Sequence, residues 1–158
     1  MRSLQLLLVF AACDRPPQVH APARGVELTG VELTTWRGAE LSASGTAKYA
    51  TLTVDGFVAE DVTLTTATET SLRAPKVDGQ MDLKQLAAAQ GLSVKSRDGC
   101  TGSTAQRVDY VEGLATTTGP VQGGGCGFTL NGARLVYSLP ERRAEVFGPV
   151  RTRIEASP

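Results

Sequence analysis

From residue 25 onward, apolar and polar residues alternate along the chain with a period of two. Val26 and Leu28 are separated by a polar residue, and Val31 and Leu33 repeat the same pattern after Gly30. Successive side chains of a strand point to opposite faces, so this alternation predicts short β-strands with one apolar face. Gly30, which interrupts the alternation, predicts a bulge between two runs.

The same alternation recurs through most of the remaining chain. It covers residues 41–49, 52–54, 62–64 and 108–110, and then Phe128, Leu130, Leu135, Tyr137, Val146, Val150 and Ile154. Gly38, Gly56 and residues 77–79 predict turns between runs. Residues 82–90 differ because their apolar positions have helical spacing and Gly91 follows as a stop signal, which predicts one short helix. The pattern therefore predicts a mostly β domain.

Composition narrows the possible classes of protein. A length of 158 residues suits one domain with a modest core. The 16 basic and 16 acidic residues cancel to a formal net charge of zero. A chain without excess positive charge lacks the electrostatic signature of nucleic-acid binding, so we expect no nucleic-acid partner.

The first residues have the features of an export signal. Arg2 supplies one positive charge, and residues 4–12 are almost wholly apolar but too few to span a bilayer as a helix. Residues 10–13 resemble the lipobox of bacterial lipoproteins, which implies removal of residues 1–12 and acylation of Cys13. Cleavage after Ala21 or Ala23 is the alternative, and it releases a chain without Cys13.

Residues 13–24 are rich in proline and lack apolar periodicity, which predicts an extended tether. Asp14 directly follows the proposed lipidated Cys13. This arrangement resembles the signal that retains some enteric lipoproteins in the inner membrane. We therefore expect a periplasmic protein held at the inner membrane by a lipid anchor, with a β domain over residues 25–158.

The other two cysteines, Cys100 and Cys126, lie in glycine-rich contexts typical of turns. In an oxidising compartment two cysteines of one small domain usually pair, so we predict a disulfide between them. A metal site is the alternative, but it needs further ligands and the only histidine, His20, lies in the tether. We expect no metal and no cofactor.

The sequence does not favour an enzyme. With His20 in the tether, a Ser or Cys nucleophile has no ordinary partner base. Glu60 and Asp61 are adjacent carboxylates, which a regular strand would point to opposite faces. Residues 123–127 are glycine-rich but lack the Lys-Ser/Thr pair and helix of a phosphate loop. We expect no catalytic residues.

One stretch of the alternating region resembles a known family. Leu41, Ala43, Ala47 and Tyr49, followed by a turn and by residues 56–58, resemble the pattern of OstA-like domains in lipopolysaccharide-export proteins of the LptA and LptC type. The resemblance covers residues 25–67 and, more loosely, 113–154. It implies an open antiparallel β-jellyroll with an apolar interior for acyl chains. A closed β-sandwich is the alternative fold, because it needs the same alternation.

The resemblance also implies a function, site residues and partners. The protein would be a periplasmic scaffold that holds acyl chains of lipopolysaccharide, or of another acylated lipid, and passes them to a neighbouring β-roll. The alternative is a cell-envelope lipoprotein whose β-sandwich is only an interaction module. The candidate lipid-binding residues are Leu52, Val54, Val62, Leu64, Phe128, Leu130 and Val146.

The C-terminal segment is the candidate site for partner proteins. We predict one final strand over residues 144–154, with Val146, Val150 and Ile154 on one face and Pro149 at a bend or on the unpaired side. Exposed strand edges are used for strand addition, so a neighbouring β-roll of the export system is expected to pair here. Arg142, Arg143, Arg151 and Arg153 form either a solvated face or a contact for lipid phosphates.

Overall fold

The structure is a computed structural model, and it describes residues 25–154 apart from 38, 83, 139 and 142. These residues form one 14-stranded sheet in which every pairing is antiparallel. The strands are β1 (Val26–Arg37), β2 (Glu40–Leu52), β3 (Phe57–Thr66), β4 (Ser71–Gly79), β5 (Gln85–Ala88), β6 (Leu92–Lys95), β7 (Thr101–Thr104), β8 (Val108–Val111), β9 (Leu114–Thr117), β10 (Val121–Gly124), β11 (Phe128–Gly132), β12 (Arg134–Ser138), β13 (Arg143–Phe147) and β14 (Arg151–Ile154). The prediction of an all-β, open antiparallel sheet is confirmed.

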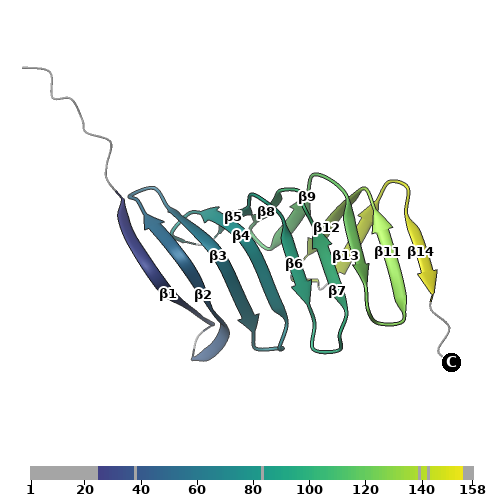
Figure 1. Cartoon of the computed structure of the whole chain (residues 1–158), viewed down its shortest axis with the longest axis horizontal. Helices are drawn as coiled ribbons and strands as arrows, with labels where there is room; N and C mark the ends of the chain where they lie inside the picture. The colour runs from purple at the N-terminus through teal and green to yellow at the C-terminus, as the bar shows by residue number, and fades with distance from the viewer. Residues whose placement is uncertain (1–24, 38, 83, 139, 142, 155–158) are drawn as a thin grey trace, which may run out of the picture.

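The sheet divides at β4. The first residues of β4 pair with β6, and its last residues pair with β5. From there two series of short strands continue, β5-β8-β9-β12-β13 on one side and β6-β7-β10-β11-β14 on the other. We call them half-sheet A and half-sheet B. Half-sheet A also includes the first residues of β1 and β3 and the last residues of β2 and β4, and half-sheet B includes the opposite ends of these strands. Figure 1 shows β5, β8, β9, β12 and β13 partly behind the strands of half-sheet B, so the sheet folds back on itself.

The fold line between the half-sheets, which we call the crease, begins within the long strands. Residue 30 of β1, residue 48 of β2, residue 61 of β3 and residue 75 of β4 are aligned across the four strands. The strands pair regularly on both sides of this line. Gly30 and Asp61 have left-handed backbone, with φ of 61° and 52°. The crease continues through connections 89–91, 105–107, 118–120, 133 and 148–150, where the chain passes between half-sheets. Each long strand thus changes direction where the short strands are interrupted.

The crease also interrupts the alternation of inward and outward side chains. Ala47 and Ala50 of β2 are both buried, as are Ala59 and Val62 of β3, although each pair is three residues apart. The two residues between them are exposed, so Glu60 and Asp61 do not alternate as the sequence predicted. The left-handed Asp61 accounts for this break. At Gly30 the backbone is irregular but the register is unbroken, and the bulge lies instead between Thr35 and Trp36.

The packed core is small and follows the crease. Among the described residues, the buried apolar side chains are only alanines and valines: Ala47, Ala50, Ala59, Val62, Ala74, Ala87, Ala88, Val108 and Val121. All except Ala87 occupy the inward rows next to the crease. Thr117, also buried there, accepts a 2.8 Å hydrogen bond from the Leu135 backbone N–H, so its polar atom is satisfied.

The predicted helix over residues 82–90 is wrong. Residues 85–88 form β5, which pairs with β4 on one side and β8 on the other. Leu86 lies beside Gly79 and Tyr110 in this register. A helix of two turns makes few internal hydrogen bonds, whereas a central strand satisfies its backbone on both edges, and pairing therefore decides the conformation. Residues 77–79, predicted as a turn, are the end of β4.

The single final strand over residues 144–154 is also wrong. It is divided into β13 in half-sheet A and β14 in half-sheet B. Gly148 has a φ of 87° and Pro149 cannot donate a ladder hydrogen bond, so the chain bends there. The expectation that Pro149 lies at a bend is confirmed. No described helix is long and apolar enough to cross a membrane.

Candidate functional site

The inward face beyond the buried rows forms an apolar groove between the half-sheets. The second inward row on each side carries larger side chains, and all of them are half-buried. Half-sheet A supplies Leu52, Phe57, Leu86, Tyr110 and Tyr137, and half-sheet B supplies Leu33, Leu64, Leu72, Val94 and Leu130. The large apolar side chains are therefore the ones that remain accessible to solvent.

This distribution distinguishes an open groove from a closed sandwich. A closed core buries its leucine and phenylalanine side chains between two sheets at close-packed density. Here burial reaches only alanine and valine next to the crease, while the Leu, Phe and Tyr row stays half-buried. The half-sheets meet at the crease, where a side chain on Gly132 would contact Val146, and they separate beyond it.

The seven predicted lipid-binding residues occupy different depths. Leu52, Leu64 and Leu130 lie in the second row of the groove. Val62, at 5% exposure, belongs to the core next to the crease, and the half-buried Val146 also lies at the crease, close to Gly132. Phe128 lies farther out, at 36% exposure. Val54 is not in a strand: it is 85% exposed in the turn between β2 and β3.

Sequence reasoning missed several groove residues. Phe57 and Leu72 belong to strands whose alternation was only partly recognised, and Leu86 was assigned to a helix. Tyr110 and Tyr137 were recognised as strand residues but were not placed in a site. Each of them lies on the same face of the sheet as the buried alanines. That shared face is the signal that could have identified them, once the break in alternation at the crease is taken into account.

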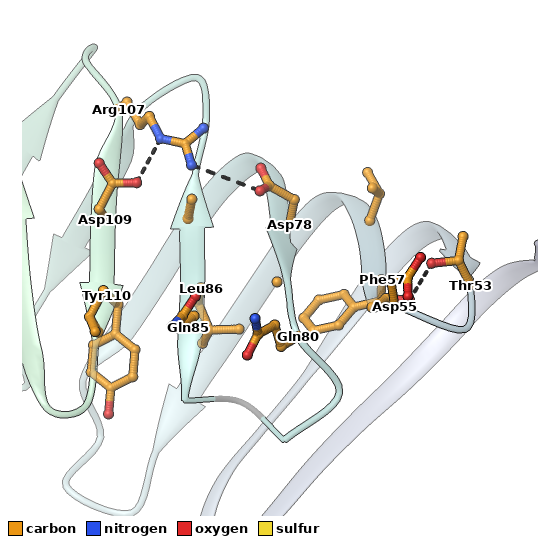
Figure 2. Close-up of a pocket in the computed structure, with 15 residues that line it drawn as sticks. Thr53, Asp55, Phe57, Asp78, Gln80, Gln85, Leu86, Arg107, Asp109 and Tyr110 are labelled. Atoms are coloured by element: carbon orange, nitrogen blue, oxygen red, sulfur yellow. Dashed lines mark hydrogen bonds and ion pairs between the residues drawn. The ribbon is translucent and has the colours of Figure 1, made fainter.

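A hollow of about 390 Å³ lies at the ends of β3, β4, β5 and β8 in half-sheet A. Phe57, Leu86 and Tyr110 of the groove row are among the residues that line it, together with Arg107, Asp78 and Asp109. Figure 2 shows Arg107 directed toward Asp109 on one side and Asp78 on the other. A second hollow, of about 410 Å³, lies at the crease and includes Asp61 and Arg73.

The charges of the first hollow are engaged with one another. The Arg107 Nε lies 2.6 Å from an Asp109 carboxylate oxygen, and a terminal nitrogen lies 3.9 Å from Asp78. The hydrogen bond from Arg107 to Asp109 raises the pKa of the guanidinium, with smaller contributions from the two carboxylate charges. In register, Ala87 lies between Asp78 and Asp109 and is buried, so this bridge spans three strands.

Cys100 and Cys126 form a disulfide in half-sheet B, with their Cα atoms 4.9 Å apart. The bridge joins the turn between β6 and β7 to the turn between β10 and β11. Because β7 pairs with β10, it connects two neighbouring hairpins at their outer ends. The bridge therefore lies along the outer margin of half-sheet B, away from the crease.

The predicted edge residues fall on both half-sheets. Val146 is in β13, Ile154 is in β14, and Val150 is in the connection between them. Among the described residues β13 pairs only with β12, β14 only with β11, and β1 only with β2. All four residues of β14 are exposed. The predicted lipidation site, Cys13, lies outside the described residues.

Comparisons with known proteins support the fold. The chain is similar to the crystal structure of LptH, the LptA-homologous periplasmic component of the lipopolysaccharide transport device of Pseudomonas aeruginosa, with a TM-score of 0.56 and 14% sequence identity. The match covers 72% of this chain and 95% of LptH. No protein-family model matches the chain. A search of curated proteins also found no match. The similarity shows an LptA-like β-jellyroll fold.

Proposed function

We propose that this protein is a periplasmic scaffold that carries lipopolysaccharide, or a closely related acylated lipid, during export. The observation that carries the proposal is the half-buried row of Leu, Phe and Tyr along both walls of an open groove. Apolar surface of this kind is costly to leave in water and is typical of a ligand-binding groove. The fold similarity to LptH, described as a component of a lipopolysaccharide transport device, favours the same ligand class.

The groove has the properties that acyl chains require. Its walls are aliphatic and aromatic, and its inward positions in β7 and β10 include Gly102 and Gly123, which face each other in register. A polymethylene chain makes no hydrogen bonds, so it gains free energy only from removal of apolar surface from water. The half-sheets contain no catalytic arrangement that we identify, and binding and transfer are the proposed activities.

Photocrosslinking can test the lipid site. A photoreactive residue at Leu64 or Leu130 in the second row should capture lipopolysaccharide, whereas one at Thr63 or Thr129, on the opposite face, should not. Val62 is a second control, because it lies on the groove side but is buried in the core. Equal capture at positions 63 and 64 would mean that lipid coats the surface without entering a groove, and no capture at any position would favour the interaction-module alternative.

We further propose that Cys13 carries a lipid anchor at the inner membrane and that a neighbouring β-roll pairs with the C-terminal edge strands. β14 is the more accessible of these edges, since all four of its residues are exposed. Arg151 and Arg153 on this strand discourage indiscriminate pairing and leave its backbone groups available. The same edge would pass acyl chains onward, because the groove runs between the half-sheets to β13 and β14.

Deletion of residues 149–158 can test the partner edge. The deletion removes β14 but keeps β13, and it should abolish capture of the neighbouring β-roll while lowering the unfolding midpoint only slightly, because β14 buries little. Crosslinking in the cell envelope measures the first effect and thermal unfolding the second. Full partner capture by the truncated protein would contradict pairing at β14.

A further inference from the structure

The two outer margins of the groove differ in the residues at their turns. We call the margin of half-sheet A, at turns 53–56, 80–84 and 112–113, lip A. We call the margin of half-sheet B, at turns 67–70, 96–100 and 125–127, lip B. At lip A two turns carry a large exposed apolar side chain, Val54 and Met81, and exposed Val111 and Leu114 flank the third turn at the ends of β8 and β9. The three turns of lip B contain only small, polar or charged residues and the disulfide, and the exposed apolar side chains of that margin, Trp36, Leu41, Phe128 and Ile154, lie in the strands.

The start of the described chain lies at lip A. Val26 pairs with Leu52, the last residue of β2 before turn 53–56, so residue 25 lies beside Thr53 at the start of that turn. Val26 itself is 60% exposed. Eleven residues, 14–24, separate residue 25 from Cys13, and three of them are prolines. Eleven residues span at most roughly 34 Å at about 3.1 Å per residue, and they join the domain at lip A, so lip A is the margin to which any anchor on Cys13 is attached.

We propose that lip A docks on the surface of the membrane that holds the anchor. The proposal rests on the lipid anchor proposed above for Cys13. Apolar side chains on adjacent turns can enter the interfacial region of a bilayer while the strands remain in water. Anchoring at residue 13 raises the effective concentration of lip A at the bilayer, so even a weak apolar contact becomes populated. Docking in this orientation opens the groove toward the bilayer from which lipid is drawn.

The charges at lip A specify the kind of bilayer surface. Asp55 and Asp82 lie beside Val54 and Met81, and Glu112 lies between Val111 and Leu114; against these three carboxylates the described residues of the turns include one basic side chain, the exposed Lys84. These carboxylates do not attract anionic lipid, so the contact is an apolar one with a zwitterionic surface. It should therefore depend little on ionic strength, unlike the docking of a basic patch.

Tryptophan fluorescence can test the orientation. The chain has one tryptophan, Trp36, which is 63% exposed near the hairpin between β1 and β2, on the side of lip B. In a Trp36→Phe background, Val54→Trp or Met81→Trp places the probe at lip A, and Thr68→Trp places it at lip B as a matched control. The chain from Cys13 onward is coupled through that cysteine to a maleimide lipid in phosphatidylcholine vesicles that carry brominated acyl chains.

We expect fluorescence at positions 54 and 81 to fall at least about twofold relative to vesicles without bromine, and fluorescence at positions 36 and 68 to stay unchanged. Equal quenching at both lips, quenching at lip B alone, or no quenching at all would overturn the proposal. Chemical coupling supplies the anchor in the experiment, so failure of Cys13 acylation in the cell, detected by mass spectrometry of the mature N-terminus, is a separate result. Photocrosslinking at Leu64 tests the groove independently.

Discussion

Half-sheets A and B line the same groove but differ in bulk and in how they are held together. In the short strands, half-sheet A presents Leu86, Tyr110 and Tyr137 to the groove. On its outer face, Arg107 forms ion pairs with the carboxylates of Asp78 and Asp109. The facing strands of half-sheet B have Gly102 and Gly123 in their second inward row, and a disulfide joins their turns. In the short strands, half-sheet A thus presents the bulkier side chains, whereas half-sheet B has exposed backbone at one pair of strands, β7 and β10, and a covalent link between their turns.

The difference follows from what each half-sheet can bury. Side chains that pack against neighbours stabilise a strand, and glycine contributes none of this packing while costing backbone entropy. Strands β7 and β10, which have glycine at paired positions in the groove row, gain little side-chain packing there. A covalent link at the ends of its hairpins compensates by restricting the unfolded chain. The comparison predicts that the two half-sheets respond differently to the same kinds of change.

The largest expected effect is the loss of the disulfide. Replacing Cys100 and Cys126 together by alanine should lower the free energy of unfolding by about 3 kcal/mol, because the bridge closes a loop of 26 residues. For a domain of this size the unfolding midpoint should fall by roughly 10 °C. Thermal unfolding with and without reductant measures both changes.

Two controls sharpen the disulfide prediction. Cys13→Ser should leave the unfolding midpoint unchanged, because Cys13 is not part of the bridge. Hydrogen exchange should show faster opening of β7 and β10 than of β8 and β9 in the variant without the bridge. Uniform loss of protection in both half-sheets would contradict the view that the bridge supports half-sheet B in particular.

The second prediction compares two glycines of half-sheet B. A side chain at Gly132 would meet the γ-carbon of Val146 across the crease, whereas a β-carbon at Gly102 would meet nothing closer than the Gln122 carbonyl oxygen at 3.9 Å. Gly132→Val should therefore cost about 1–3 kcal/mol through overpacking. Gly102→Val should change stability by about 0.5 kcal/mol or less.

The same pair of variants separates folding from binding. Gly102→Val places a side chain in the open groove, so it should weaken lipid capture by the Leu64 photocrosslinker although the protein stays folded. Denaturant unfolding and crosslinking yield are the two measurements. If Gly102→Val destabilises the fold as much as Gly132→Val does, the space above Gly102 is closed and the groove does not extend over half-sheet B.

The sequence predicts the long strands better than the short strands of either half-sheet. Period-two alternation identifies β1, β2 and β3 because their inward positions are Val, Leu and Ala between polar residues. Residues 101–104 escape recognition, since Gly102 and Thr104 occupy inward positions and provide no apolar signal. Apolar alternation is visible only where inward positions carry apolar side chains. A strand with glycine at an inward position, such as β7, forms because neighbouring strands pair with it.

The crease is the feature that sequence could not supply. It depends on the alignment of Gly30, Lys48, Asp61 and Pro75 across four neighbouring strands, and this alignment follows from long-range register. For the same reason, the depth of each candidate residue was not predictable. Val62 and Leu64 belong to one alternating run, yet one is buried next to the crease and the other lines the groove. The turn position of Val54 shows that apolar character alone does not place a residue in the site.

The smallest expected effect concerns the bridge that holds half-sheet A. Arg107 links β8 to β4 across β5, and like any arginine it is charged at any pH at which the protein is handled; the hydrogen bond to Asp109 raises its pKa further. All three side chains are partly exposed, so solvent and salt screen the attraction, and Arg107→Gln should lower the unfolding midpoint only slightly. The difference from the wild type should shrink further in 1 M salt, at about a 3 Å screening length. Arg97→Gln is the matched control in half-sheet B, since its 3.4 Å pair with Glu69 is more exposed and should contribute still less. If Arg107→Gln lowered the unfolding midpoint as much as removal of the disulfide does, half-sheet A would also depend on one dominant link. The proposed contrast, in which side-chain packing stabilises half-sheet A and the disulfide stabilises half-sheet B, would then be wrong.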